Sequence, residues 1–181
     1  MRQRIQKLPQ LRNGLTEESA PVKEYRISKY DPQFRVNGAY QKNEWISISD
    51  IGKVFDDGVL TLAEYLRVEN EYIQFCLNAM KAAGVTGLSV CTPEIYCEGL
   101  RLPKRVCDTD SICEIIRWCL REKCWAKLEG TRFFLHFGYD YYLYIGTDVP
   151  KPLVETLAKE QNLYCEYYRS PYGENGDDVS P

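Results

Sequence analysis

The sequence predicts an α+β domain: a mostly antiparallel sheet, a central three-stranded meander at residues 124–146, and two to three helices packed on it. Strand formers fill residues 124–146 in blocks, and the turns Glu129-Gly130 and Gly138-Tyr139-Asp140 separate the blocks. Longer segments elsewhere repeat apolar residues every three or four positions, which is typical of amphipathic helices. Because the strands of the meander follow one another without an intervening helix, the pattern favours α+β over a doubly wound parallel sheet.

The first predicted strand covers residues 24–30, where Tyr25 and Ile27 alternate with polar residues before Asp31-Pro32. Residues 31–43 contain a proline and an Asn-Gly pair, so we expect an extended loop or an irregular hairpin there. A serine at position 47 or 49 then caps a short helical turn.

The strongest helix prediction covers residues 61–83. Apolar side chains recur at spacings of three and four, Thr61 and Glu64 have the spacing of a capping box, and Gly84 ends the helix. Its opposite face is charged and is expected to be solvated.

Two further helices are predicted at residues 111–123 and 150–161. Ser111 is the expected cap of the first, and Thr147 or Asp148 that of the second. The predicted order is strand, helix, strand, helix, meander, helix, strand.

The segment at residues 92–107 is predicted to be a long irregular insertion after a strand at residues 87–91, because Pro93, Gly99 and Pro103 interrupt it. Long loops in compact domains often carry function. A final strand is expected at residues 163–168.

Composition sets the domain organisation and the broad class. The sequence predicts a flexible basic arm at residues 1–22, a single domain at residues 23–172 and a disordered acidic tail at residues 173–181. A net charge of −3 and a pI of about 5.4 disfavour nucleic acid as a main partner. No apolar run reaches the roughly 20 residues that span a bilayer, and residues 1–14 lack the apolar core of a secretory signal. We therefore expect a soluble, cytoplasmic protein.

Eight cysteines and one histidine are the candidate metal ligands. The cysteines form no C-x-x-C pair, which structural zinc sites usually need. We expect no metal site and no cofactor, and we interpret the cysteines mainly as reduced core thiols.

His136 is the one candidate for general base catalysis, with Asp140 or a cysteine as its partner. Strand parity places His136 with Phe134, on the side opposite Phe133 and Leu135, which favours a packing role. Phosphate-loop and dinucleotide fingerprints do not occur.

Both faces of the meander are apolar or aromatic, and one of them carries Phe134, His136, Tyr142 and Tyr144. Either helices cover both faces, or this tyrosine-rich face meets a partner. The irregular segments add one more candidate binding anchor each. These anchors are Trp45 and Tyr96.

Two stretches carry a resemblance to known proteins. They are YRISKYDPQFRVNGAYQKNEWISISDIGK at residues 25–53 and CLREKCWAKLEG…FFLHFGYDYYLYIG at residues 119–146, followed by Ser170-Pro171-Tyr172. Together they resemble a group of small bacterial proteins, most of them without an assigned function. Some proteins of this kind resemble immunity proteins of bacterial toxin systems, including contact-dependent inhibition. The resemblance implies neutralisation of a cognate toxin by direct binding and implies no catalytic residues.

The leading hypothesis is therefore a non-enzymatic protein-binding module, in particular an immunity protein. The alternative is a small hydrolase or transferase that uses His136 with a nearby Asp or Cys. A third hypothesis, RNA binding by stacking aromatics, requires more basic residues than surround these tyrosines.

Overall fold

The computed structural model describes residues 21–173. The predicted basic arm, apart from its last two residues, and the acidic tail beyond Gly173 lie outside the described residues. The domain boundaries therefore stay a prediction.

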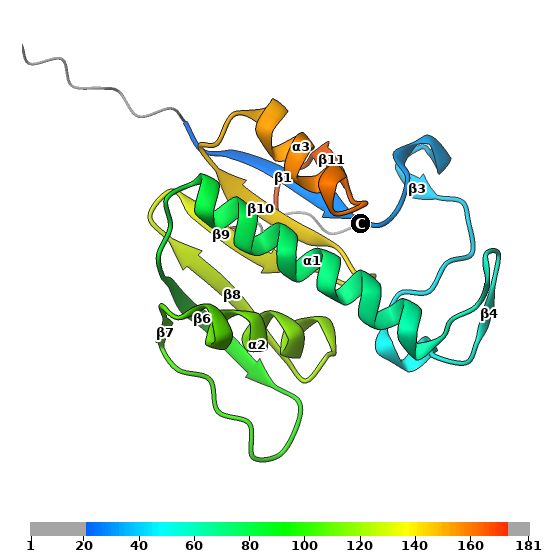
Figure 1. The fold of residues 1–181 in the computed structure, drawn as a ribbon, viewed down its shortest axis with the longest axis horizontal. Helices are drawn as coiled ribbons and strands as arrows, with labels where there is room; N and C mark the ends of the chain where they lie inside the picture. The colour runs from blue at the N-terminus through cyan, green and yellow to red at the C-terminus, as the bar shows by residue number, and fades with distance from the viewer. Residues whose placement is uncertain (1–20, 174–181) are drawn as a thin grey trace, which may run out of the picture.

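A seven-stranded antiparallel sheet is the centre of the fold (Figure 1). The strand order across it is β11-β1-β10-β9-β8-β6-β7. Its strands are β1 (Lys23–Ser28), β6 (Leu88–Ile95), β7 (Arg105–Val106), β8 (Cys124–Gly130), β9 (Phe133–Phe137), β10 (Leu143–Thr147) and β11 (Tyr164–Tyr167). The three helices in the described residues are α1 (Leu62–Ala82), α2 (Thr109–Leu120) and α3 (Lys151–Glu160). The predicted α+β class is confirmed, and the predicted helices and strands follow one another in the expected order, with β7 and four short hairpin strands in addition.

The predicted meander forms as β8, β9 and β10. Each strand pairs with the next in antiparallel register, so that Lys127 lies opposite His136 and His136 lies opposite Tyr144. Strand parity then gives the sheet two chemically different faces. Phe133 and Leu135 point into the core, whereas His136 and Tyr144 point to the other face.

All three helices lie against the same face of the sheet (Figure 1). α1 runs in nearly the same direction as the strands behind it (Figure 1) and begins where Thr61 Oγ1 accepts a hydrogen bond from the Glu64 amide at 3.1 Å. In the middle of α1 the buried Tyr72 hydroxyl accepts from the Lys29 amide and donates to the Tyr141 carbonyl, both at 2.8 Å. These two bonds hold the residue after β1 and the connection between β9 and β10 against α1.

A buried carboxylate joins α1 to α2. The Glu69 side chain accepts two hydrogen bonds from Arg121, at 2.6 and 2.7 Å, and Arg117 Nε lies 3.4 Å from it. Glu69 is buried, while both arginines reach solvent in part. This cluster compensates the cost of placing a carboxylate between the two helices.

Helix caps differ from the sequence-based predictions in two places. The cap of α2 is Asp108, whose Oδ1 accepts from the Ser111 amide at 2.8 Å, so the helix starts two residues before Ser111. α3 has no side-chain cap, because Asp148 binds Arg132 instead and Pro150 takes the cap position.

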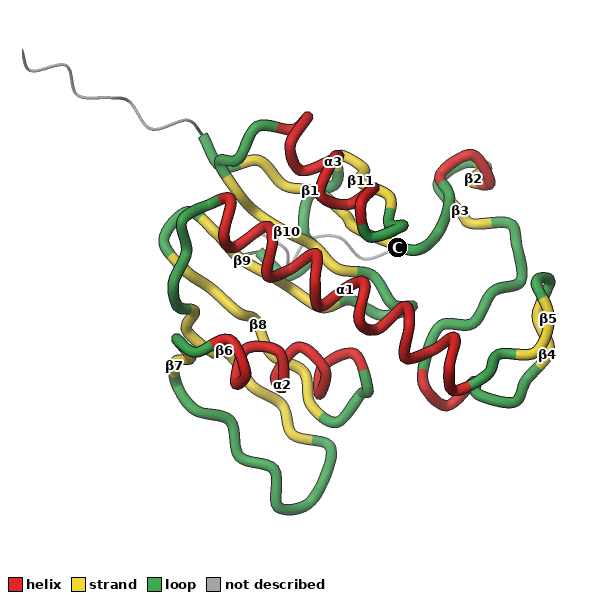
Figure 2. The backbone as a smooth tube through the Cα atoms, in the orientation of Figure 1, coloured by secondary structure: helices red, strands yellow, loops and turns green. Residues whose placement is uncertain are grey.

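The predicted insertion at residues 92–107 is less irregular than expected. β6 continues through a bulge to Ile95, and β7 pairs with its first half. The remaining residues form the long loop between β6 and β7 (Figure 2).

Two short hairpins extend beyond one end of the sheet (Figure 2). They pair β2 (Arg35–Val36) with β3 (Ala39–Tyr40), and β4 (Val54–Phe55) with β5 (Gly58–Val59). Between them, Ser47 caps a 3₁₀ turn at Ile48–Asp50, as expected for one of the two serines.

Over residues 21–173, no helix has the length and apolar character needed to cross a bilayer.

Candidate functional site

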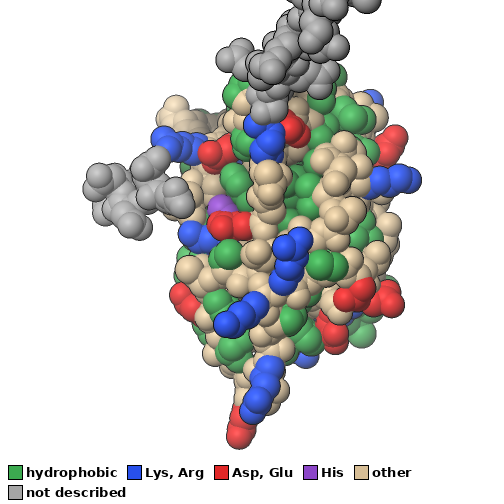
Figure 3. Space-filling view, turned by 90° about the vertical axis from the view of Figure 1, so that its left-hand side faces the viewer, with side chains coloured by type: hydrophobic (Ala, Val, Ile, Leu, Met, Phe, Trp, Pro, Cys, Tyr) green, Lys and Arg blue, Asp and Glu red, His purple; other side chains and the backbone are tan. Residues whose placement is uncertain are grey.

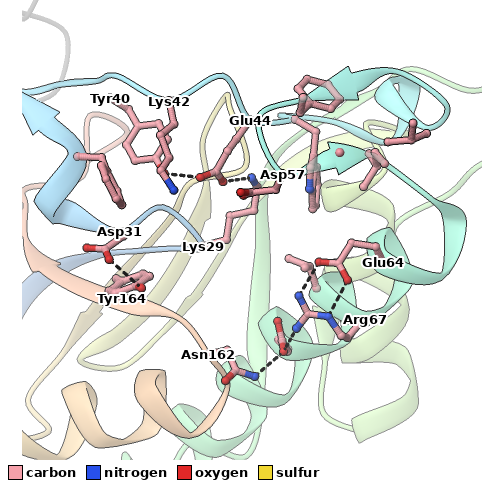
Figure 4. A pocket seen from close by; sticks show the side chains of 18 of the residues that line it. Lys29, Asp31, Tyr40, Lys42, Glu44, Asp57, Glu64, Arg67, Asn162 and Tyr164 are labelled. Carbon is pink, nitrogen blue, oxygen red and sulfur yellow. Dashed lines mark hydrogen bonds and ion pairs between the residues drawn. The ribbon is translucent and has the colours of Figure 1, made fainter.

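A polar cleft of about 560 Å³ opens between the hairpins and α1 (Figure 4). At its base Lys29 Nζ lies 2.9 Å from Glu44 Oε2, and the Tyr40 hydroxyl also bonds Glu44. Lys29 contacts two rings, because its Nζ lies 4.1 Å from the ring centroid of Tyr30 and 4.3 Å from that of Trp45. Burial lowers the pKa of Lys29, and Glu44 opposes that effect.

The walls of the polar cleft are also paired internally. Arg67 bonds Glu64 and Glu71 on α1, and Asn162 donates to Glu71 at 2.7 Å (Figure 4). These pairs stabilise the cleft and engage several of the charged groups that a ligand would otherwise contact. Among residues 21–173, no three His, Cys, Asp or Glu side chains gather as a metal site would require.

A second concavity, the aromatic pocket, has about 310 Å³ and lies at the end of the meander. Its lining is more apolar than polar. Three of its residues are strongly exposed: Tyr139 at 84%, Tyr96 at 57% and Ile46 at 44%. The Trp125 indole is fixed by a 2.7 Å hydrogen bond to the Phe137 carbonyl. The other lining residues include Cys119, Cys124, Asp140, Tyr142 and Tyr172.

His136 is buried on the face of the sheet opposite the helices. Residues 168–172, the C-terminal segment, lie over it: the Ser170 hydroxyl is 2.8 Å from Nδ1, and the Tyr172 ring lies edge-on to the imidazole. On the other side Nε2 is 3.2 Å from Glu129 Oε1. A carboxylate can only accept, so we assign the imidazole proton to Nε2, and Nδ1 then accepts from Ser170. Burial lowers the pKa of His136 to about 4, with Glu129 opposing.

The neutral His136 therefore has hydrogen-bond partners at both ring nitrogens and a side chain that is 2% exposed. It lines neither the polar cleft nor the aromatic pocket. Figure 3 shows the histidine, in purple, as a small area beside a carboxylate, on a face where positive and negative side chains alternate. This geometry favours the packing role.

The structure divides the predicted site residues among three places. Tyr96 and Tyr142 line the aromatic pocket, together with Asp140, which forms no hydrogen bond with His136. Trp45 is buried at the polar cleft. Beneath the C-terminal segment, Tyr144 packs on the rings of Tyr168 and Tyr172, beside His136 and Phe134.

Sequence reasoning missed Tyr139, Trp125 and Tyr172 as pocket residues. Tyr139 lies in the turn between β9 and β10, where an aromatic residue has no core to face. Its place in a turn was the sequence feature that could have identified it as a binding residue. Tyr172 reaches Trp125, with ring centroids 5.3 Å apart, only because the C-terminal segment crosses the sheet.

Gly146 keeps the ring stack beside His136 in place. The Phe134 ring stacks on the imidazole at 4.1 Å, and a Cβ at position 146 would lie 2.0 Å from Phe134 Cε1. We expect Gly146→Ala to displace this ring and to lower the free energy of unfolding by roughly 1–2 kcal/mol. Urea unfolding measures the change.

The matched test is a double-mutant cycle with Phe134→Ala. Removing the ring should abolish most of the cost of the added methyl, so strong non-additivity is expected. Additive effects would mean that Gly146→Ala acts elsewhere.

Comparison of the chain with protein-family models, curated proteins and solved structures found no match.

Proposed function

We propose that this chain is a non-enzymatic protein-binding module that contacts its partner through the aromatic pocket. The exposure of Tyr139, Tyr96 and Ile46 around one mainly apolar concavity carries this proposal. Exposed aromatic residues around a pocket are typical of interface hot spots, since a tyrosine buries a large ring and keeps its hydroxyl available for hydrogen bonds.

Acidic residues border the aromatic pocket and indicate the chemistry of the partner. Glu122 and Asp140 line the pocket, and Glu94 accepts a hydrogen bond from the Tyr96 hydroxyl at 2.8 Å. We propose a partner that inserts an apolar or aromatic side chain flanked by basic residues. Complementary charge of this kind increases the association rate and selects against acidic partners.

The class of partner that we propose is a cognate bacterial toxin, which makes the chain an immunity protein acting in the cytoplasm. The support is the resemblance of residues 25–53 and 119–146, together with the net charge of −3, which suits a basic toxin. Hydrolase or transferase chemistry at His136 stays a prediction from the sequence. The imidazole is buried and has a hydrogen-bond partner at each ring nitrogen, which does not favour such chemistry.

The test uses the product of the neighbouring gene, co-expressed and then titrated against the purified full chain. We expect a complex, and we expect Tyr139→Ala and Tyr96→Ala each to weaken it by about tenfold or more. Tyr167→Ala is the matched control, because Tyr167 is 56% exposed, does not line the aromatic pocket and lies on the edge strand β11.

Loss of affinity in the control to the same degree as in the pocket variants would contradict the pocket as the contact site. Failure to form any complex would contradict the toxin partner. Thermal unfolding of each variant identifies a substitution that acts through the fold.

A further inference from the structure

Two cysteine sulfurs lie side by side at the junction of α2 and β8. Cys119 is in the last turn of α2 and Cys124 is the first residue of β8, with their Sγ atoms 3.8 Å apart. The turn between them is tightly held: the Lys123 amide donates to the Trp118 carbonyl at 2.9 Å, and the Glu122 amide donates to the Cys119 carbonyl at 3.1 Å. The backbone therefore holds the two thiols in contact.

This pair differs from the other cysteines of the chain in two respects. All eight cysteines belong to the described residues, and among them only Cys119 and Cys124 have their sulfur atoms in contact. Both are buried, and both also line the aromatic pocket, which is the route by which a small reagent would approach them.

The hydrogen bond between the two thiols shifts their pKa values in opposite directions. It raises the pKa of Cys119, with burial acting in the same direction, and it lowers the pKa of Cys124 despite burial. This difference favours Cys124 as the thiol that loses its proton first, and a thiolate is the form that attacks a disulfide.

We propose that Cys119 and Cys124 form a redox-active dithiol that small disulfides oxidise through the aromatic pocket. The Cys124 thiolate attacks one sulfur of the small disulfide, which forms a mixed disulfide and releases one thiolate. Cys119 then loses its proton and attacks the Cys124 sulfur, which closes the Cys119–Cys124 bond and releases the second thiolate. The two cysteines lose two electrons in total, and the small disulfide gains them as it becomes two thiols.

The sequence provides a direct readout. Trypsin cleaves after Arg117, Arg121, Lys123 and Lys127, so the two cysteines fall on the separate peptides WCLR, residues 118–121, and CWAK, residues 124–127. The native full chain is treated with bis(2-hydroxyethyl) disulfide, its remaining thiols are alkylated, and the digest is analysed by mass spectrometry without reduction. We expect the linked pair WCLR–CWAK to form at least about ten times faster than any other cysteine pair.

Variants then identify the order of the two steps. Cys119→Ser should stop the reaction at the mixed disulfide on Cys124, whereas Cys124→Ser should remove the linked peptide without a persistent adduct on Cys119. Cys113→Ser, on the same helix, is the matched control and should react as the unmodified chain does.

Absence of the linked peptide in the native chain would overturn the proposal. Formation at the same rate in urea-unfolded chain would also overturn it, because the folded geometry would then contribute nothing. The assay contains no protein partner, so its outcome is independent of the proposed binding function.

Discussion

Glu69→Ala is expected to lower the free energy of unfolding by about 3 kcal/mol. The substitution removes the acceptor of two short hydrogen bonds from Arg121 and the neighbour of Arg117, and it leaves these cations beside the interface of α1 and α2. Breaking a buried pair costs roughly 3–5 kcal/mol, and the partial exposure of both arginines places the expected value at the lower end. Urea unfolding at neutral pH measures it.

The control for Glu69→Ala lies on the same helix. Glu64 pairs with Arg67 at the surface, with both side chains about half exposed, so Glu64→Ala should cost less than about 1 kcal/mol. Equal costs for the two substitutions would show that burial of Glu69 does not determine its contribution.

Stability is expected to fall by about 2 kcal/mol between pH 7 and pH 4.5 because of His136. The folded pKa is about 4, whereas an unfolded histidine titrates near 6.5. In this interval the unfolded chain binds a proton that the folded chain does not, so the unfolded state gains stability as the pH falls. The contribution is fully present above the unfolded pKa, is lost as the pH falls from the unfolded towards the folded pKa, and does not change further below the folded pKa.

His136→Gln tests the origin of this pH dependence. The glutamine side chain retains hydrogen-bonding capacity and does not titrate between pH 7 and 4.5, so the stability of the variant should vary by less than half as much over the same interval. Carboxylates also titrate near the lower limit, and they affect both proteins alike. An unchanged pH profile in the variant would contradict the assignment to His136.

Local periodicity was sufficient to predict the helices and the meander. α1 has its stripe of apolar residues and its threonine cap within one continuous segment, so neighbouring residues determine it. The caps of α2 and α3 were wrong because several residues competed for each position. At α2 the cap is Asp108, which precedes the predicted Ser111. At α3 the side chain of Asp148 accepts a hydrogen bond from Arg132, sixteen residues away along the chain, and does not cap the helix.

The candidate site depends on contacts that periodicity does not contain. Tyr142 and Tyr144 share a face by strand parity, yet Tyr144 is buried because Tyr168 and Tyr172 pack on it from the end of the described chain. The polar cleft likewise joins Lys29, Arg67 and Asn162 from distant segments. Only tertiary packing brings such residues together. The sequence therefore identified a region rich in aromatic residues, and not which of these residues are exposed.

The position of β1 in the sheet determines when the fold can be completed during synthesis. Among the described strands β1 is synthesised first, yet its neighbours are β10 and β11, so Tyr25 pairs with Ile145 and Tyr167. More than a hundred residues must therefore leave the ribosome before β1 has a partner on either side, and closing such long loops slows folding. Until then the emerging chain holds an unpaired N-terminal strand, which makes the last strands to be synthesised the ones that complete the sheet.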